Sequence, residues 1–249
     1  MVLRMRILFL DVEISPTLAT VWGLWKQNIN IDAIIGDSRV LTWAASWEGE
    51  DHVLYSDGLT DHKAMIKGIH ELLEEADYVC TYNGDRFDLK ILNQEFLEAS
   101  LPPPSPYKSI DLLKTVKKNF RFTSNKLDYI TGKLGLGNKI KHRGYQLWLD
   151  CMNGKKAAFK EMSEYNVQDV VLLEKLFYRL TPWISGLNRA MESGKYVCPR
   201  CGGNHLQHRG TRKTLLGTYE RLQCTDCGGW MTGTQVQERS DITTRLRPL

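Results

Sequence analysis

The sequence lacks long hydrophobic runs, internal repeats and low-complexity segments. A helix that crosses a bilayer needs about 20 consecutive apolar residues, and no apolar run in the 249 residues approaches that length. The apolar stretch 5–10 is too short for a secretory signal, and acidic residues follow it at once. With 42% apolar and 25% charged residues, the composition is typical of a soluble globular protein. We therefore expect a cytoplasmic protein that does not associate with membranes.

Cysteine is also sparse, and neither sign of charge dominates. In a cytoplasmic protein, the six cysteines are thiols or metal ligands rather than a disulfide framework. The formal net charge is only +4, but its distribution is uneven: from residue 194 onward, nine Lys and Arg residues accompany four acids, and the preceding part is nearly neutral. A basic C-terminal segment points to nucleic acid as a partner.

The pattern of apolar residues predicts an α/β fold. A continuous apolar run over 5–12 is typical of a strand buried on both faces, and it is expected to open an antiparallel meander. The expected strands are 5–12, 18–25, 39–47, 52–55 and 77–82, and the expected helices are 61–76, 85–100, 111–119, 125–134 and 157–180. This order indicates a mixed β-sheet flanked by helices. We expect one domain over 1–185, a linker over 186–194 and a small domain over 195–249.

Four cysteines in the small domain form two Cys-x-x-Cys pairs. Cys198 and Cys201 precede Cys224 and Cys227, and two glycines follow each pair. Four thiolates are the number that a tetrahedral structural zinc requires, and glycine lets the backbone turn around the metal. About 55 residues bury little surface, so one Zn²⁺ would supply the missing folding energy. The segment 195–233 resembles the zinc-ribbon family.

Two further sets of residues remain open to alternative interpretations. His205 and His208 are possible substitute zinc ligands. Basic residues in two loops could bind nucleic-acid phosphates or could be a solvated surface; they are Lys139, Lys141, His142 and Arg143, and, between the cysteine pairs near the tip of a hairpin, Arg209, Arg212 and Lys213. The ribbon could instead dock a replication or repair protein. Trp22, Trp25, Trp43 and Trp47 are expected to pack in the core or at sheet edges rather than to stack on bases.

Two acidic residues end the first predicted strand. Asp11 and Glu13 are two positions apart, so their carboxylates share one face of the strand while Leu10 and Val12 point to the other. Adjacent like charges repel, and burial raises the cost of ionising both. A bound divalent cation would remove that cost.

Two more acids lie on predicted helices. Asp88 opens the helix after the second buried strand, and Asp85, three residues earlier, is a rival for the same role. Asp169 lies in the long last helix with Tyr165 four residues before it, so the two side chains share one helical face. Asp111 is explained equally well as a helix cap.

These motifs together resemble those of a known enzyme family. Asp-x-Glu at 11–13, Asn-x-x-x-Phe-Asp at 83–88 and Tyr-x-x-x-Asp at 165–169 are similar to the three motifs of the DEDDy 3′–5′ exonucleases, which have a ribonuclease H-like fold and include polymerase proofreading domains. The stretch 109–113 adds likeness to the family-B polymerase subgroup. The histidine of the sister DEDDh group would stand where this chain has Glu164. The resemblance covers residues 5–180.

The resemblance implies a two-metal mechanism and a set of site residues. Two Mg²⁺ or Mn²⁺ ions would be held by Asp11, Glu13, Asp88 and Asp169, and Tyr165 would orient the attacking water. The expected reaction is hydrolysis of terminal phosphodiesters of DNA to nucleoside 5′-monophosphates, in replication, repair or recombination. An RNA exonuclease or a structure-selective nuclease is an alternative within enzymes. A nucleic-acid-binding adaptor without turnover is the alternative from another class.

Overall fold

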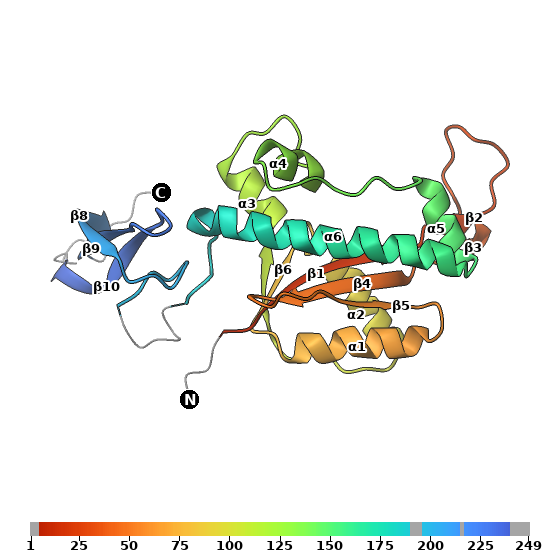
Figure 1. Cartoon of the computed structure of the whole chain (residues 1–249), viewed down its shortest axis with the longest axis horizontal. Helices are drawn as coiled ribbons and strands as arrows, with labels where there is room; N and C mark the ends of the chain where they lie inside the picture. The colour runs from red at the N-terminus through yellow and green to blue at the C-terminus, as the bar shows by residue number, and fades with distance from the viewer. Residues whose placement is uncertain (1–4, 190–195, 215–216, 240–249) are drawn as a thin grey trace. The chain divides into compact units, whose positions relative to one another are not determined.

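The computed structural model describes residues 5–189, 196–214 and 217–239 (Figure 1). The chain divides into two compact units: Arg6–Tyr178, called the larger unit below, and a C-terminal unit that begins at Arg179. The domain boundaries expected from the sequence stay a prediction. Within the described part of the chain, no helix combines the length and the apolar character that a membrane span needs.

The larger unit is built on a five-stranded sheet, and its mixed parallel and antiparallel pairing agrees with the prediction of a mixed sheet. Its strands, in spatial order, are β5 (Leu54–Asp57), β4 (Val40–Trp47), β1 (Ile7–Ile14), β6 (Tyr78–Thr81) and β7 (Lys108–Asp111). Strand β4 runs antiparallel to β1 and β5, whereas β6 runs parallel to β1 and β7. The central position of β1 explains its continuous apolar run, because both of its faces are covered.

Helices cover both faces of this sheet (Figure 1). They are α1 (His62–Glu74), α2 (Asp88–Glu98), α3 (Leu112–Asn119), α4 (Leu127–Lys133), α5 (Tyr145–Met152) and α6 (Lys156–Leu180). Leu8 and Leu10 pack in the core with α1 and α2, whereas Phe9 packs edge-to-face on Phe177 of α6 at 5.2 Å. The alternation along β1 therefore sends the odd-numbered side chains, which include Asp11 and Glu13, toward α6.

Aspartate side chains begin two of these helices. Asp61 accepts a hydrogen bond from the backbone N–H of Ala64 at 2.9 Å, and Asp111 accepts one from Leu113 at 3.0 Å. Both are N-caps that satisfy a free N–H of the first turn. The capping interpretation of Asp111 is confirmed.

The expectation of a strand over 18–25 is wrong. Only β2 (Leu18–Ala19) is extended, and it pairs with β3 (Ile34–Gly36) in a separate two-stranded sheet. The chain between β2 and β3 is a loop that ends in the 3₁₀ turn η1 (Ile31–Ala33). In this loop Trp22 and Trp25 are almost fully exposed. Apolar residues in this stretch have no partner strand on which to pack, so their strand propensity is not realised.

The other two tryptophans expected on strands lie in the core. Trp43 and Trp47 of β4 are both buried, and the Trp43 indole N–H donates to the Met65 carbonyl at 2.8 Å. Strands β3 and β7 and helix α5 were not expected from the sequence; β7 pairs in parallel with β6, and α5 follows Gly144.

The C-terminal unit contains a three-stranded antiparallel sheet. Its strands are β8 (Leu206–Thr214), β9 (Gly217–Cys224) and β10 (Trp230–Arg239), in the order β10-β9-β8. A 3₁₀ turn, η2 (Thr181–Trp183), precedes them. The second Cys-x-x-Cys pair lies where β9 leads into β10, and the first precedes β8.

Candidate active site and cysteine cluster

Three of the four predicted acids meet on the face of the sheet that α6 covers. Asp11 and Glu13 extend from β1, and Asp169 extends from α6. One carboxylate oxygen of each lies within 4.8 Å of the other two. The strand period of two and the packing of α6 on β1 thus bring together side chains that are more than 150 residues apart in sequence.

The fourth acid, Asp88, reaches the same strand from the start of α2. Its Oδ1 accepts a hydrogen bond from the backbone N–H of Val12 at 3.2 Å, between Asp11 and Glu13. The rival Asp85 is engaged elsewhere, because its carboxylate contacts the Ser109 hydroxyl and the Lys114 ammonium group. Of these two residues, Asp88 is therefore the one adjacent to the acidic cluster.

Burial and mutual repulsion make this cluster difficult to ionise. Burial, followed by the charges of Asp88, Glu13 and Asp169, raises the pKa of Asp11 well above its usual range. Burial and the charge of Asp169 raise the pKa of Glu13 to about 8, and burial raises the pKa of Asp88 to about 6. Perturbed carboxylates that share a site are typical of functional centres, and a cation would favour their charged forms.

One carboxylate oxygen of the cluster lacks a partner. Within the described residues, Oδ1 of Asp169 is a buried side-chain atom without a hydrogen bond. Buried polar atoms are rarely left unsatisfied. An unpaired buried carboxylate oxygen beside two further carboxylates fits a divalent cation, since oxygen donors are the ligands that Mg²⁺ and Mn²⁺ prefer.

Lys139 supplies a positive charge at the cluster. Its Nζ forms an ion pair with Oδ2 of Asp169 and donates a hydrogen bond to the Tyr165 hydroxyl at 3.0 Å. Burial, together with the charge of Asp169, raises the pKa of Tyr165 to about 12, so the phenol remains protonated at neutral pH. Tyr165 and Asp169 lie one turn apart on α6 and share a face, as their spacing predicts.

Two residues at the cluster were not identified from the sequence. Asn166 is fully buried; its Nδ2 donates to Oδ2 of Asp11 at 2.7 Å, and its Oδ1 accepts from the Thr42 hydroxyl at 3.0 Å. Trp148 of α5 lies beside Glu13, and its side chain opposes the rise in the pKa of that carboxyl. For Asn166, the sequence offers only one signal, which is its position next to Tyr165 on the packed side of a long helix.

The four residues of the loop predicted to bind phosphates lie in four different environments. Lys139 joins the acidic cluster, and Lys141 is exposed. The His142 ring packs edge-on against Tyr165 at 4.8 Å. Arg143 is paired with two carboxylates, Glu161 and Asp150. A role of these residues in nucleic-acid binding stays a prediction.

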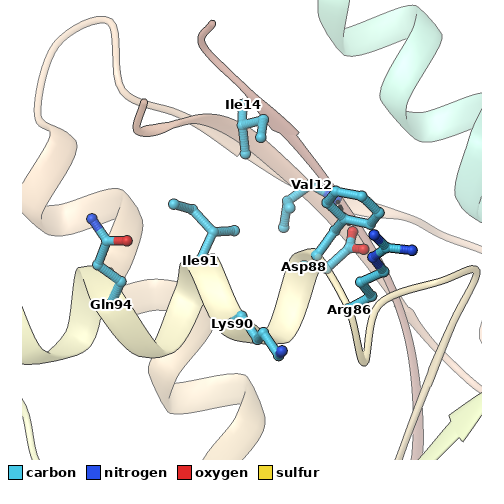
Figure 2. Close-up of a pocket in the computed structure, with 8 residues that line it drawn as sticks. Val12, Ile14, Arg86, Asp88, Lys90, Ile91 and Gln94 are labelled. Carbon is cyan, nitrogen blue, oxygen red and sulfur yellow. Dashed lines mark hydrogen bonds between the residues drawn. The ribbon is translucent and has the colours of Figure 1, made fainter. Parts of the chain in front are cut away.

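A groove lies beside Asp88 (Figure 2). Its volume is about 420 Å³, and the side chains that line it are Val12, Ile14, Arg86, Phe87, Asp88, Lys90, Ile91 and Gln94. Figure 2 shows Asp88 and Arg86 at one end and Gln94 at the other. Phe87 is half-exposed, so the groove offers an aromatic and aliphatic surface that ends at a carboxylate of the candidate site.

The four cysteines of the C-terminal unit form a compact cluster. Their Sγ atoms lie within 4.8 Å of one another, with 3.8 Å between Cys198 and Cys227 and 3.7 Å between Cys201 and Cys224. Zn–S bonds of about 2.3 Å in a tetrahedron place sulfurs about 3.8 Å apart. The cluster therefore fits the structural zinc of a zinc ribbon.

The two Cys-x-x-Cys-Gly-Gly segments fold alike. Gly202 and Gly228 both have φ of 78°, a conformation that glycine adopts at low cost. Each segment closes with equivalent backbone hydrogen bonds, and Gly203 and Gly229 donate N–H bonds to the Sγ atoms of Cys201 and Cys227. The prediction that glycine lets each segment turn is confirmed.

Neither of the two candidate histidine ligands belongs to the cysteine cluster. The His205 ring is paired with Asp226 at 2.7 Å, and His208 lies on the exposed strand β8. Arg209, Arg212 and Lys213 are exposed on the same strand. They lie on the strand that leads to the hairpin turn, and their contact with phosphates stays a prediction.

Comparisons with known proteins identify the fold. A model of the RNase H superfamily matches residues 37–181. The solved structure of the family B DNA polymerase from the hyperthermophilic archaeon Pyrobaculum calidifontis is similar, with a TM-score of 0.52 and 16% sequence identity over 87% of this chain and 32% of that chain. The chain thus spans about a third of the polymerase, and the likeness is one of fold. No curated protein matches. The chain belongs to the RNase H superfamily.

Proposed function

We propose that the protein is a metal-dependent 3′–5′ exonuclease that hydrolyses terminal phosphodiesters of DNA and releases nucleoside 5′-monophosphates. Membership of the RNase H superfamily supports a nuclease-type activity in general. The observation that carries the proposal is the meeting of Asp11, Glu13 and Asp169 beside Asp88, in the chain order of the DEDDy motifs. The preference for DNA rests on the fold likeness to a DNA polymerase and is an analogy.

The residues present fit divalent cations. Asp11, Glu13, Asp88 and Asp169 would hold Mg²⁺ or Mn²⁺, since their donors are carboxylate oxygens and Oδ1 of Asp169 has no other partner. Bound ions of this kind supply an activated water and stabilise charge on the leaving oxygen. A site with four carboxylates and one nearby lysine would repel phosphates without such ions, which argues against an adaptor that only binds nucleic acid.

The other side chains have roles that follow from their contacts. Tyr165 is protonated at neutral pH, because its pKa is about 12, so it can donate a hydrogen bond to a water or a phosphate oxygen but cannot act as a base. The side chain of Lys139 is flexible, so its ammonium group can leave the ion pair with Asp169 and bind a phosphate oxygen instead. Asn166 fixes the orientation of the Asp11 carboxylate. The groove beside Asp88 can accept an apolar part of the terminal nucleotide.

A gel assay tests the proposal. Single-stranded DNA with a 5′ label, incubated with the protein and Mg²⁺ or Mn²⁺, should give a descending ladder, and no shortening should occur without the metal. The variants Asp11→Asn and Asp169→Asn should slow the reaction at least 100-fold, whereas Glu164→Gln, an exposed acid on the same helix, should not. Chromatography should identify the product as a 5′-monophosphate.

Other outcomes of this assay would select an alternative. Faster degradation of an RNA of the same sequence would assign RNA as the substrate. Cleavage confined to branched or gapped duplexes would indicate a structure-selective nuclease. Binding without any shortening, over a range of metals, would contradict the enzymatic proposal and favour the adaptor.

A further inference from the structure

One face of the ribbon sheet carries a distinct set of side chains, which we call the arginine–tryptophan face. Residues directly opposite each other in neighbouring strands share a face, and the register pairs Arg212 with Tyr219, Gln223 with Trp230 and Arg221 with Thr232. The alternation along β9 places Tyr219, Arg221 and Gln223 on the same side. The face therefore includes Gln207, Arg212, Tyr219, Arg221, Gln223, Trp230 and Thr232.

The other face of the same sheet provides the packing. Leu222 and Cys224, which alternate with the residues above along β9, are buried. Trp230 in contrast is 48% exposed, and Arg212 and Arg221 are exposed as well. About half of the Trp230 side chain therefore lies in solvent beside two exposed arginines, so the arginine–tryptophan face is accessible to a partner.

Both guanidinium groups of this face are held in place. Arg221 lies over the Trp230 ring at 5.4 Å from its centroid, and its Nε donates to the Arg209 carbonyl at 3.0 Å. Arg212 reaches the Thr232 hydroxyl, with 3.5 Å between Nη1 and Oγ1. A stacked arginine on an indole offers a flat, positively charged surface with little rotational freedom left to lose.

Carboxylates are directed away from this face. The register puts Glu220 on the packed face, where it accepts a hydrogen bond from Tyr196. Asp226 lies in the second Cys-x-x-Cys segment and is paired with His205. Among the side chains that the structure describes, the arginine–tryptophan face has no acid to neutralise its two arginines. Its net charge is positive, and its flat groups are aromatic or guanidinium.

We infer that the arginine–tryptophan face binds single-stranded nucleic acid. Unpaired bases stack on aromatic rings and on guanidinium planes, for which Trp230, Tyr219 and Arg221 are suited. Arg212 is placed at the edge strand to contact a phosphate, and Gln223 can donate to and accept from base edges. A duplex hides its base faces, so the chemistry of this face favours single strands. The inference does not rest on hydrolysis by the larger unit.

Fluorescence anisotropy with the full zinc-loaded chain tests this inference. The probes are a labelled single-stranded DNA, an RNA of the same sequence and the corresponding DNA duplex, in buffer without Mg²⁺, Mn²⁺ or chelator. Trp230→Ala should weaken single-strand binding about 10-fold, within the range for loss of one stacked base. Arg212→Gln should weaken it and lower the slope of log affinity against log salt by about one.

A control of the same charge change lies in the larger unit. Lys67→Gln removes one positive charge from the exposed surface of α1 and should change the affinity less than twofold. Trp230→Phe keeps an aromatic plane and should retain most of the binding. Zinc content and melting temperature establish that each variant is folded, and if Trp230→Ala loses zinc it is replaced by Trp230→Leu, which also removes the aromatic plane.

Three results would overturn the inference. The first is wild-type affinity in both Trp230→Ala and Arg212→Gln, the second is an equal loss in Lys67→Gln, and the third is tighter binding of the duplex than of either single strand. The DNA and RNA probes decide which single strand the face prefers. Because no hydrolysis takes place without divalent metal, a chain that binds here but never shortens DNA would contradict only the proposed function.

Discussion

Asn166 donates a hydrogen bond from Nδ2 to Oδ2 of Asp11 at 2.7 Å, across 155 residues of sequence. The same amide accepts a hydrogen bond from the Thr42 hydroxyl of β4, so its orientation is fixed at both ends. The hydrogen bond from Asn166 thereby fixes Oδ2 of Asp11, whereas Oδ1 takes no part in it. A neutral donor orients a carboxylate without competing for its charge, which is the function of residues that surround a metal ligand.

Replacing Asn166 should therefore impair the reaction without removing a ligand. We expect Asn166→Ala to lower the metal-dependent rate 10- to 100-fold, the usual cost of losing a residue that orients a ligand, and to raise the Mg²⁺ concentration for half-maximal rate. Steady-state rates over a Mg²⁺ series measure both effects. Glu164→Gln, on the exposed side of the same helix, is the control. An unchanged Mg²⁺ dependence would contradict the orienting role.

Lys139 should compete with a divalent cation for Asp169, because its ammonium group already pairs with that carboxylate. We expect Lys139→Gln to lower the melting temperature of the metal-free protein by a few degrees, the shift that about 1–2 kcal/mol gives in a chain of this size. The rise in melting temperature on adding Mg²⁺ should be larger than in the wild type. Thermal melts in metal-depleted buffer, with and without Mg²⁺, measure both values.

The exposed neighbour Lys141 provides the control for this experiment. Lys141→Gln removes the same charge from the same loop and should leave both melting temperatures unchanged. If Lys139→Gln had the same response to Mg²⁺ as the wild type, Lys139 would not compete with the ion.

Glu95 should make the larger unit sensitive to acid. Its buried carboxylate accepts the Val40 N–H at 2.7 Å and is hydrogen-bonded to His62 at 2.8 Å. Burial alone would raise the pKa of Glu95, but these hydrogen bonds outweigh it and hold the pKa below its ordinary value. Because the folded-state pKa is depressed, the stabilisation is present above the unfolded value of about 4.3 and is lost as the pH falls through the folded value.

Glu95→Gln should therefore cost about 1–2 kcal/mol at pH 7, as for a hydrogen-bonded buried charge. The difference in unfolding free energy between wild type and variant should shrink as the pH falls below about 4.3. Urea unfolding at a series of pH values measures it. Glu71→Gln, an exposed substitution on α1, should have no pH-dependent effect. A difference that stays constant down to pH 2 would refute the role of Glu95.

The cysteine cluster should hold one zinc per chain, and that zinc should stabilise only the C-terminal unit. We expect Cys224→Ser to abolish zinc binding, as measured by metal analysis of the purified protein, and to make the segment after residue 195 susceptible to proteolysis. Cys151→Ser, at a buried cysteine of the larger unit, should retain one zinc. Zinc retained at full stoichiometry in Cys224→Ser would rule out the four-cysteine site.

The parts of the fold that follow from local patterns could be predicted from the sequence. The pairing of Asp11 with Glu13 follows from the strand period, the shared face of Tyr165 and Asp169 follows from helical spacing, and the caps of α1 and α3 follow from single aspartates. The two glycine-terminated cysteine segments are similarly local. In each case the deciding interaction spans only a few residues.

Features that depend on distant partners could not be predicted. Trp22 and Trp25 have strand propensity, but whether a strand forms there depends on a neighbour that the local sequence does not encode. Lys139 belongs to a basic loop whose composition is typical of phosphate binding. In the structure, however, its partner is Asp169, 30 residues away. Asn166 gives no local sign that Asp11 is its acceptor.

The exposure of Trp22 and Trp25 gives the protein an intrinsic optical probe. Both indoles are almost fully exposed in the loop between β2 and β3, whereas Trp43 and Trp47 are buried in the sheet. A collisional quencher dissolved in water reaches the first pair and is kept from the second. Fluorescence emission therefore separates into an accessible and a shielded fraction. Trp183 and Trp230 are about half exposed as well, so in a variant with both replaced by Phe, a molecule that binds over this loop will change the accessible fraction and can be followed without attaching a label.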